Sequence, residues 1–136
     1  MTYEPAPFPS NEERRVEIVD KIDLVGDHHD DLFYNYCELG KVLSGFDHAA
    51  VTIMTSDKQC SLATSDGSRM DHARKDSICQ YAILKSEPTI VYKLSEHPIF
   101  RNQRNVVSGE LVGSFCAFPI INKNNYALGT FCLANE

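Results

Sequence analysis

Two apolar runs near the end of the chain constrain its fold more than any other stretch. Residues 114–121 (SFCAFPII) and 126–133 (YALGTFCL) are rich in aromatic and β-branched side chains, and the Asn-rich segment 122–125 separates them. This pattern predicts a β-hairpin. In the first run Phe115 and Ala117 would point to one face of the sheet, whereas Cys116 and Phe118 would point to the other. Because both faces are apolar, we expect the hairpin in the middle of a sheet that is covered on both sides.

Size and composition indicate one globular domain. The chain has 136 residues, of which 43% are hydrophobic and 24% are charged, as in ordinary globular proteins. No run approaches the roughly 18 apolar residues of a membrane span, and no signal peptide is visible, so we expect a cytoplasmic protein with no membrane partner. The net charge of −6 argues against nucleic-acid binding, which needs a basic surface. The five cysteines are expected as reduced thiols.

The other segments predict helices and short strands around the hairpin. Residues 1–9 are rich in proline and predict an extended arm. Ser10 and Glu13 have the spacing of a capping box, which predicts a helix over residues 12–22. A second helix with a broad apolar stripe (Leu32, Phe33, Tyr36, Cys37, Leu39, Val42 and Leu43) is expected from about residue 30 to a stop at Ser44-Gly45. Further expected elements are strands at 49–54, 59–63 and 89–92, a loop at 64–75, a short helix at 76–84 and a long irregular segment at 93–113.

In this order of elements most neighbouring strands can pair as hairpins and few crossovers are needed. Such an order favours an α+β fold in which a mostly antiparallel sheet carries helices on both faces. Five segments, in order, then resemble the GAF domain family, a small ligand-binding sensory module related to PAS domains. They are 9–15 (PSNEERR), 31–40 (with DLF and LG), 76–83 (DSICQYAI), 98–102 (PIFRN), and the paired strands 115–120 and 128–133. The resemblance implies a sheet of five to six strands, with a ligand pocket between that sheet and the layer that contains the helix at residue 76.

The resemblance also indicates how the chain is divided. Residues 10–136 are expected to be a single GAF domain that follows the extended arm. Family members continue into a C-terminal helix after the last strand, and this helix is not seen in the sequence. We therefore expect a fragment of a longer signalling protein, with sheet surface that favours a homodimer.

The N-terminus of the helix at residue 76 is the strongest candidate site in the sequence. Free backbone N–H groups there can bind an anion, and cationic side chains (Arg69, His72, Arg74 and Lys75) precede it. The resemblance places further side chains on the opposite wall. Together the expected ligand-binding residues are Asp76, Ser77, Cys79, Gln80, Tyr81, Phe100, Asn102, Phe115 and Ala117. In the alternative interpretation, Asp76 or Ser77 only caps the helix and the cations are solvated.

The cysteines and histidines offer weaker hypotheses. Bilin-binding GAF domains attach their chromophore through a Cys that His follows, but Gln80 follows Cys79 here. If the hairpin closes symmetrically about Asn124, Cys116 and Cys132 face each other, and a register shift of one residue separates them. The run at 28–31 (HHDD) has metal-ligand residue types, but consecutive histidines are poorly placed to chelate one ion. We therefore expect no metal ion and no cofactor.

The sequence contains no G-x-S-x-G, P-loop, H-E-x-x-H or C-x-x-C motif. We therefore expect a non-enzymatic sensory domain that binds an unknown small molecule and signals to an output domain of the same longer chain. By resemblance, that output domain would be a kinase, a cyclic-dinucleotide enzyme or a transcription regulator. Two alternatives stay open: a redox enzyme similar to GAF-type methionine sulfoxide reductases, and a degenerate GAF domain that serves only dimerisation.

Overall fold

The chain folds into an α+β structure built on one six-stranded antiparallel sheet. The computed structural model describes residues 2–22, 30–67, 71–111 and 113–135. The strand order across the sheet is β3-β2-β1-β6-β5-β4. The strands are β1 (His48–Met54), β2 (Lys58–Thr64), β3 (Asp71–Ala73), β4 (Thr89–Val91), β5 (Phe115–Ile121) and β6 (Ala127–Ala134). The sequence-based expectation of a mostly antiparallel sheet of five to six strands is confirmed.

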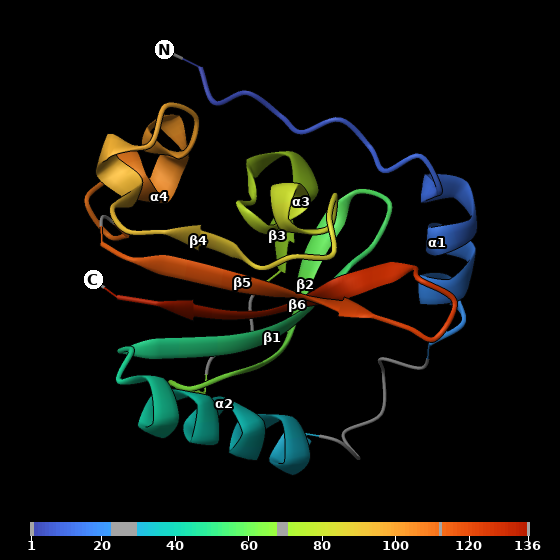
Figure 1. The fold of residues 1–136 in the computed structure, drawn as a ribbon, viewed down its shortest axis with the longest axis horizontal. Helices are drawn as coiled ribbons and strands as arrows, with labels where there is room; N and C mark the ends of the chain where they lie inside the picture. The colour runs from blue at the N-terminus through green and yellow to red at the C-terminus, as the bar shows by residue number, and fades with distance from the viewer. Residues whose placement is uncertain (1, 23–29, 68–70, 112, 136) are drawn as a thin grey trace.

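Helices cover both faces of the sheet (Figure 1). Helix α2 (Asp30–Ser44) lies on one face, and α3 (Cys79–Ala82) and α4 (Arg104–Val107) lie on the other, together with the 3-10 turns η2 (Arg74–Asp76), η3 (Leu94–Glu96) and η4 (Phe100–Asn102). Helix α1 (Glu12–Asp20) stands beside one end of the sheet, and the N-terminal segment passes over α3 to reach it. No helix in the described ranges is long and apolar enough to cross a membrane.

The predicted hairpin is formed by β5 and β6 and occupies the middle of the sheet, as expected. Each of its faces is covered by a separate hydrophobic core. Phe115 and Ala117 belong to the core beneath α3, whereas Cys116 belongs to the core beneath α2, which also contains Cys37 and Val51. The apolar character of both strand faces therefore reflects two packed layers.

The hairpin register differs by one residue from the symmetric pairing considered in the sequence analysis. The loop is symmetric about Asn124, because the N–H of Asn122 donates to the carbonyl of Tyr126 and Ile121 pairs with Ala127. An irregularity between Ile120 and Ile121 then shifts the pairing along the rest of the hairpin. As a result Cys132 pairs with Ala117, and Cys116 pairs with Leu133. Cys116 and Cys132 do not face each other, because one extra residue in a strand moves every later side chain to the opposite face.

The two long helices differ in detail from their predicted forms. The stop of α2 at Gly45 is confirmed, since Gly45 has a φ of 77° and its N–H donates to the carbonyl of Lys41. The predicted apolar stripe is only partly buried: Cys37 is 0% exposed, but Leu39, Val42 and Leu43 are 54%, 78% and 77% exposed. The predicted capping box of α1 is wrong. Asn11 occupies the N-cap without a side-chain hydrogen bond.

The segment before α3 also corrects the sequence analysis. Residues predicted as a loop at 64–75 include the edge strand β3. The helix predicted at 76–84 is a single turn, because Ser77 is extended (φ −83°, ψ 154°) and separates α3 from η2. Ser77 was one of the two predicted caps, and its Oγ accepts the N–H of Gln80 at 3.2 Å. Asp76 ends η2 and does not cap α3.

Candidate functional site

Several of the predicted ligand-binding residues meet between α3 and the sheet, but they fill this space themselves. Cys79, Phe100, Phe115 and Ala117 are all members of one hydrophobic core and are 2%, 3%, 5% and 0% exposed. Packed interiors of this kind leave little room for a ligand. Side chains of the domain itself therefore fill the space in which the sequence analysis expected a ligand.

Two other predicted site residues hold the N-terminal arm of the chain. The hydroxyl of Tyr3 donates to the carbonyl of Ser77 at 2.8 Å, and the N–H of Ala6 donates to Oε1 of Gln80 at 3.0 Å. Gln80 is 3% exposed, and its amide nitrogen donates to the carbonyls of Ser77 and Lys75 at 2.7 and 3.0 Å. Burial raises the pKa of the Tyr3 hydroxyl well above its usual value. The predicted extended arm is thus docked on α3 by specific hydrogen bonds.

An aromatic cluster completes the attachment of the arm. The Tyr81 hydroxyl donates to the carbonyl of Glu4, and the Tyr81 ring lies 6.3 Å from the Tyr3 ring and 5.4 Å from the Phe100 ring between centroids. His97 stacks on Phe100 at 4.3 Å, and its Nδ1 accepts the N–H of Phe100 at 3.2 Å. The Tyr81 and Phe100 rings meet edge to face, which is a favourable geometry for aromatic pairs. Both predicted site residues therefore pack against other parts of the domain.

Asp76 and Asn102 lie at the ends of the 3-10 turns η2 and η4, beside a residue that the sequence analysis missed. Gln103 is 5% exposed; its amide nitrogen donates to the carbonyl of Asp76 at 2.9 Å. Its Oε1 accepts the N–H groups of Asn105 and Val106 at 2.8 and 3.3 Å and so caps α4. Gln103 thereby joins η2 to α4 across the top of the domain. Gln103 stands three residues before Val106, which is the spacing of a capping side chain and the N–H that it accepts, and this spacing was the available signal.

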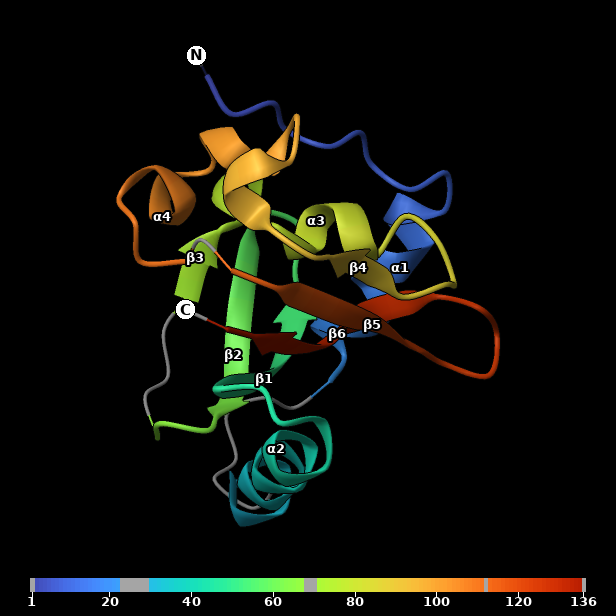
Figure 2. The same ribbon diagram turned by 60° about the vertical axis from the view of Figure 1, so that its left-hand side comes forward.

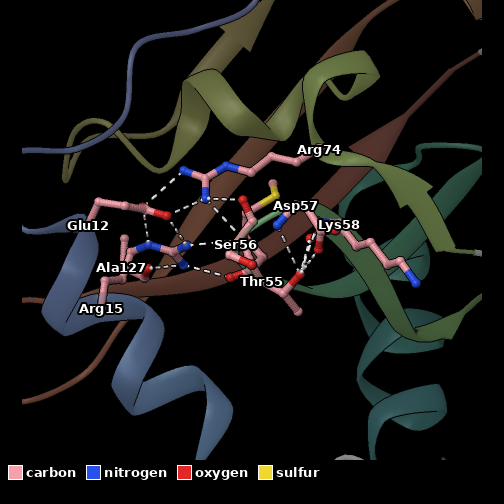
Figure 3. Close-up of polar contacts among 9 residues, drawn as sticks. Glu12, Arg15, Thr55, Ser56, Asp57, Lys58, Arg74 and Ala127 are labelled. Carbon is pink, nitrogen blue, oxygen red and sulfur yellow. Dashed lines mark hydrogen bonds and ion pairs between the residues drawn. The ribbon is translucent and has the colours of Figure 1, made fainter.

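One of the cations near the helix at residue 76, which the alternative interpretation placed in solvent, is deeply buried. Arg74 is 4% exposed and forms a two-pronged ion pair with Glu12 at 2.5 and 3.0 Å. Arg15, which is 0% exposed, binds the same carboxylate through Nε at 2.9 Å. Figure 3 shows Glu12 between the two guanidinium groups. We call Glu12, Arg15 and Arg74 the arginine clasp.

The arginine clasp ties α1 to three other parts of the fold. Arg15 Nη1 donates to the carbonyls of Met54 and Ala127 at 2.7 and 3.3 Å, and Arg74 Nη1 donates to the carbonyl of Thr55 at 3.0 Å (Figure 3). The Phe8 ring lies 4.3 Å from the Arg74 guanidinium, close enough for a cation–π contact. Burial acts to raise the pKa of Glu12, but hydrogen bonds from Arg74 and Arg15 outweigh it and lower the pKa below its usual value.

A cavity of about 350 Å³ lies next to the filled core. It opens between the ends of β1, β2 and β6 on one side and α4 with residues 110–111 on the other, and β3 contributes to its wall. Figure 2 shows α4 beside β3 at this end of the domain. The lining residues are His48, Ala49, Ala50, Thr64, Ser65, Asp66, His72, Asn105, Glu110, Leu111, Cys132 and Ala134. None of the nine predicted site residues lines it.

The cavity combines an apolar floor with a polar rim. Alanines of β1 and β6 and Leu111 supply the apolar lining, which we call the floor, and His72 of β3 and Asn105 of α4 supply part of the polar lining, which we call the rim. The side chains of His72 and Asn105 take part in no hydrogen bond among the described residues. Glu110 adds an exposed carboxylate. Sites that bind small molecules have this composition, an apolar body with a few polar groups at the edge.

Cys132 lines the cavity, and Cys79 of α3 belongs to the adjoining core. Thr130 Oγ1 lies 3.2 Å from Cys79 Sγ and 2.8 Å from Thr52 Oγ1. The Cys132 thiol interacts with Cys79 and lowers the pKa of Cys79 against the opposing effect of burial. The same interaction, together with burial, raises the pKa of Cys132 well above its usual value.

No group of three or more potential metal ligands occurs in the part of the chain that the structure covers. His28 and His29, the histidines of the run considered in the sequence analysis, lie outside the described residues, as do the side chains of the aspartates that follow them.

Comparison with known proteins identifies relatives of this fold. The GAF domain family matches residues 28–136, whereas no curated protein matches the sequence. The solved structures that resemble it include the nlh2 GAF domain of A. aeolicus in an inactive state, with 16% identity, a TM-score of 0.60, and coverage of 93% of this chain and 80% of that one. The GAF domain of a phosphoenolpyruvate-protein phosphotransferase from Coxiella burnetii is 11% identical, with a TM-score of 0.63 and coverage of 92% and 77%. A free methionine-R-sulfoxide reductase from Neisseria meningitidis, in complex with its substrate, is 16% identical, with a TM-score of 0.60 and coverage of 90% and 70%.

Proposed function

Because the chain belongs to the GAF domain family, we propose that it is a non-enzymatic regulatory domain that binds a small polar molecule in the cavity beside α4. The observation that carries this proposal is the cavity itself, whose volume of about 350 Å³ falls in the range of small-molecule sites. The region between α3 and the sheet is packed with side chains, so the ligand is assigned to the cavity and not to the predicted pocket.

The charge of the rim favours one class of ligand. Two of the lining residues, Asp66 and Glu110, are acidic, and no lysine or arginine is among the lining residues. The domain as a whole has a net charge of −6, so anions are repelled as they approach. We therefore assign to the cavity a neutral or cationic molecule that presents hydrogen-bond donors to the rim and a short apolar body to the alanines.

The contacts of the cavity wall supply a route by which binding could alter the rest of the protein. His72 lines the cavity from β3, and Arg74 of the arginine clasp follows it by two residues. Arg74 holds Glu12 at the start of α1. A ligand that stabilises the observed position of β3 favours the closed clasp, provided that it binds this state more tightly than the alternative.

A thermal-shift screen of polar metabolites tests the proposal, with four-carbon putrescine and succinate as a matched cationic and anionic pair. We expect hits among amines and neutral polar molecules, and no shift with succinate. The shift should be lost in Asn105→Ala and His72→Ala, because both residues line the rim. It should persist in Asp76→Ala, a substitution at a predicted site residue that does not line the cavity.

A variant that fills the cavity sharpens this test. Ala50 lines the floor and is partly exposed, so Ala50→Leu places extra methyl groups in the space that the ligand would occupy. We expect a folded protein that no longer responds to the hits. Binding that survives Ala50→Leu, or binding that Asp76→Ala abolishes, would contradict the assignment to this cavity.

The larger assembly belongs to the same proposal. We place the domain in the cytoplasm, within a longer chain whose output domain is a kinase, a cyclic-dinucleotide enzyme or a transcription regulator. A homodimer is supported by the exposed apolar side chains of α2 and by Phe118, which is 40% exposed on the same side of the sheet as α2. Sedimentation of the wild type against Leu39→Lys tests this, since a monomeric wild type would contradict it.

A cysteine-dependent sulfoxide reductase is the second candidate function. It is favoured by Cys132, which lines the cavity, with Cys79 in the adjoining core, and by the likeness to the Neisseria meningitidis free methionine-R-sulfoxide reductase. Incubation with free methionine sulfoxide and dithiothreitol tests it. Turnover that disappears in Cys79→Ser and Cys132→Ser, but persists in Cys116→Ser, would support it. Absence of reduction by the wild type would exclude it.

A further inference from the structure

The N-terminal arm, which the structure describes from residue 2 to residue 9, lies on α3 in the manner of a bound peptide. Figure 1 shows it as an extended segment that passes over α3 before it enters α1. Tyr3, Ala6 and Pro9 are partly buried, whereas the residues between them are exposed. A burial period of three residues is that of a polyproline II helix, and the three prolines of the arm favour this conformation. The arm therefore presents one edge of such a helix to the domain.

The surface beneath the arm holds the backbone of this segment. Gln80 is 3% exposed, and its amide nitrogen donates to two carbonyls of the domain, so its Oε1 is left to accept the N–H of Ala6 at 3.0 Å. The Tyr81 hydroxyl donates to the carbonyl of Glu4. Because both contacts are made to main-chain groups of the arm, they recognise its backbone conformation more than its side chains.

Aromatic contacts fix the two ends of the arm. The Tyr3 ring packs against the core beneath α3, and its hydroxyl donates to the carbonyl of Ser77 at 2.8 Å. At the other end the Phe8 ring lies 4.3 Å from the guanidinium of Arg74. Polyproline II segments dock in grooves lined by aromatic side chains, and the aromatic cluster around Tyr81 supplies such a lining here. The contacts beneath the arm thus have the composition of a peptide-recognition site.

We propose that η2 and α3 form a recognition site for a polyproline II segment, and that the arm of a second copy of this chain is its occupant in trans. The arm has the required chemistry, because two aromatic anchors five residues apart have prolines between them. Residues 3–8 make the contacts described above, and the joint to α1 at residues 9–11 makes none of them. These contacts are therefore the same whichever copy supplies the arm. Exchange of an identical segment between two copies is a low-cost route to a dimer.

The arm of the same chain competes with any free peptide for this site. A tethered segment has an effective concentration on the order of millimolar, so a free peptide displaces it only at a comparable concentration. Two copies that exchange arms meet this barrier once, because the second exchange is intramolecular after the first arm has crossed. We therefore expect the wild type to exchange arms at about 1 mM protein. A chain with a weakened arm should bind free peptide at much lower concentration.

A fluorescent peptide of residues 2–10 tests the site by anisotropy. The protein is the full chain with Tyr3→Ala and Phe8→Ala, which remove both anchors of its own arm. We expect this variant to bind the peptide at least tenfold more tightly than the wild type does, and the peptide to raise its Tm. Phe8→Ala alone, at a side chain that is 62% exposed, leaves the core intact and should also bind more tightly than the wild type. Absence of binding by both variants would overturn the proposal.

Matched changes separate recognition of the arm from nonspecific binding. In the peptide, Pro5→Gly with Pro7→Gly alters only exposed residues but releases the backbone conformation, so binding should weaken about fivefold or more. Tyr81→Phe in the protein removes the donor to the Glu4 carbonyl and should weaken binding about fivefold, as for one lost hydrogen bond. Affinity that neither change alters would show that the site does not recognise the arm.

Exchange between copies has a measurement of its own. A nitrogen-15-labelled chain with Phe8→benzoylphenylalanine is mixed with unlabelled chain at about 1 mM and irradiated. Mass spectrometry should find labelled arms joined to unlabelled peptides from η2 and α3. Leu39→Lys, which opposes the proposed homodimer through α2, should leave these mixed cross-links unchanged, because α2 makes none of the arm contacts. Cross-links confined to labelled chains would contradict arm exchange, whatever the outcome of the metabolite screen.

Discussion

The arginine clasp allows a sharp prediction about the stability of the domain. Glu12→Ala removes the carboxylate that neutralises two guanidinium groups, those of Arg15 at 0% and Arg74 at 4% exposure. Breaking a buried ion pair by removal of one partner costs about 3–5 kcal/mol. Both arginines keep hydrogen bonds to backbone carbonyls, so we expect the lower end of that range, about 3 kcal/mol. For a domain of this length, the corresponding fall in Tm is roughly 10 °C.

Urea unfolding at neutral pH measures this loss, and α1 supplies two matched controls. Glu13→Ala removes another carboxylate from the first turn of α1, where the helix dipole is worth only about 0.3–1 kcal/mol. Glu17→Ala breaks the ion pair with Arg14, whose side chains are 58% and 52% exposed, and should change stability little. Equal losses in all three variants would refute the argument, because the effect would then follow charge and not burial.

The pH dependence gives an independent check on the same carboxylate. Hydrogen bonds from both arginines lower the pKa of Glu12 below its usual value of 4.5. A carboxylate with a lowered folded-state pKa contributes stability that is complete above the unfolded-state pKa and is lost as the pH falls through the folded-state pKa. The stability difference between wild type and Glu12→Gln should therefore be constant near neutral pH and shrink below about 4.5. A difference that grows on acidification would show that the carboxylate is not bound as the structure describes.

Three further outcomes follow from individual contacts. In Gly129→Ala the new Cβ would lie 1.9 Å from the carbonyl oxygen of Thr52, so the pairing of β1 with β6 must shift; we expect a loss of about 3 kcal/mol or more in urea unfolding, and a loss under about 1 kcal/mol would contradict this contact. Tyr81→Phe removes the hydrogen bond to the carbonyl of Glu4; stability should fall by about 1 kcal/mol, and limited proteolysis should cut the arm faster than in the wild type. The pKa of His97, which burial lowers, should be below 6.5 in an NMR titration; a value above 6.5 would contradict its stacked position on Phe100.

The features that could be predicted from sequence were those set by short-range pattern. The hairpin of β5 and β6 was recognisable because its strands are apolar on both faces, a property that only a covered central position explains. The end of α2 followed from one glycine. In contrast, β3 has only three residues, Asp71–Ala73, and lacks the β-branched side chains that mark a strand. Its existence depends on pairing with β2, which no local pattern reveals.

The candidate site was less predictable because it depends on contacts between distant segments. The nine predicted site residues, taken from the helix at residue 76 and from the wall that the family resemblance places opposite it, converge in part, but the arm and the aromatic cluster occupy their surface. The loop is symmetric about Asn124, as the sequence analysis assumed. The pairing partner of Cys132 is instead set by the irregularity between Ile120 and Ile121, which lies beyond the loop. One signal was available and unused. In the predicted helix 12–22, Arg15 shares a face with Val19 and Ile22 (positions i, i+4 and i+7), and a cation on an apolar stripe indicates a buried ion pair.

The link from the cavity to the clasp through His72 of β3 and Arg74 of η2 leads to a test of signalling that is separate from the test of binding. If ligand binding and clasp closure favour the same state of β3 and η2, then each must strengthen the other by the same factor. Opening the clasp by Glu12→Gln should therefore weaken the tightest hit of the metabolite screen, by about 5-fold or more for a coupling of 1 kcal/mol. Isothermal titration against Glu17→Gln as the control measures this directly. An unchanged Kd in Glu12→Gln would mean that the cavity and α1 are energetically independent, and that any signal leaves the domain by another route.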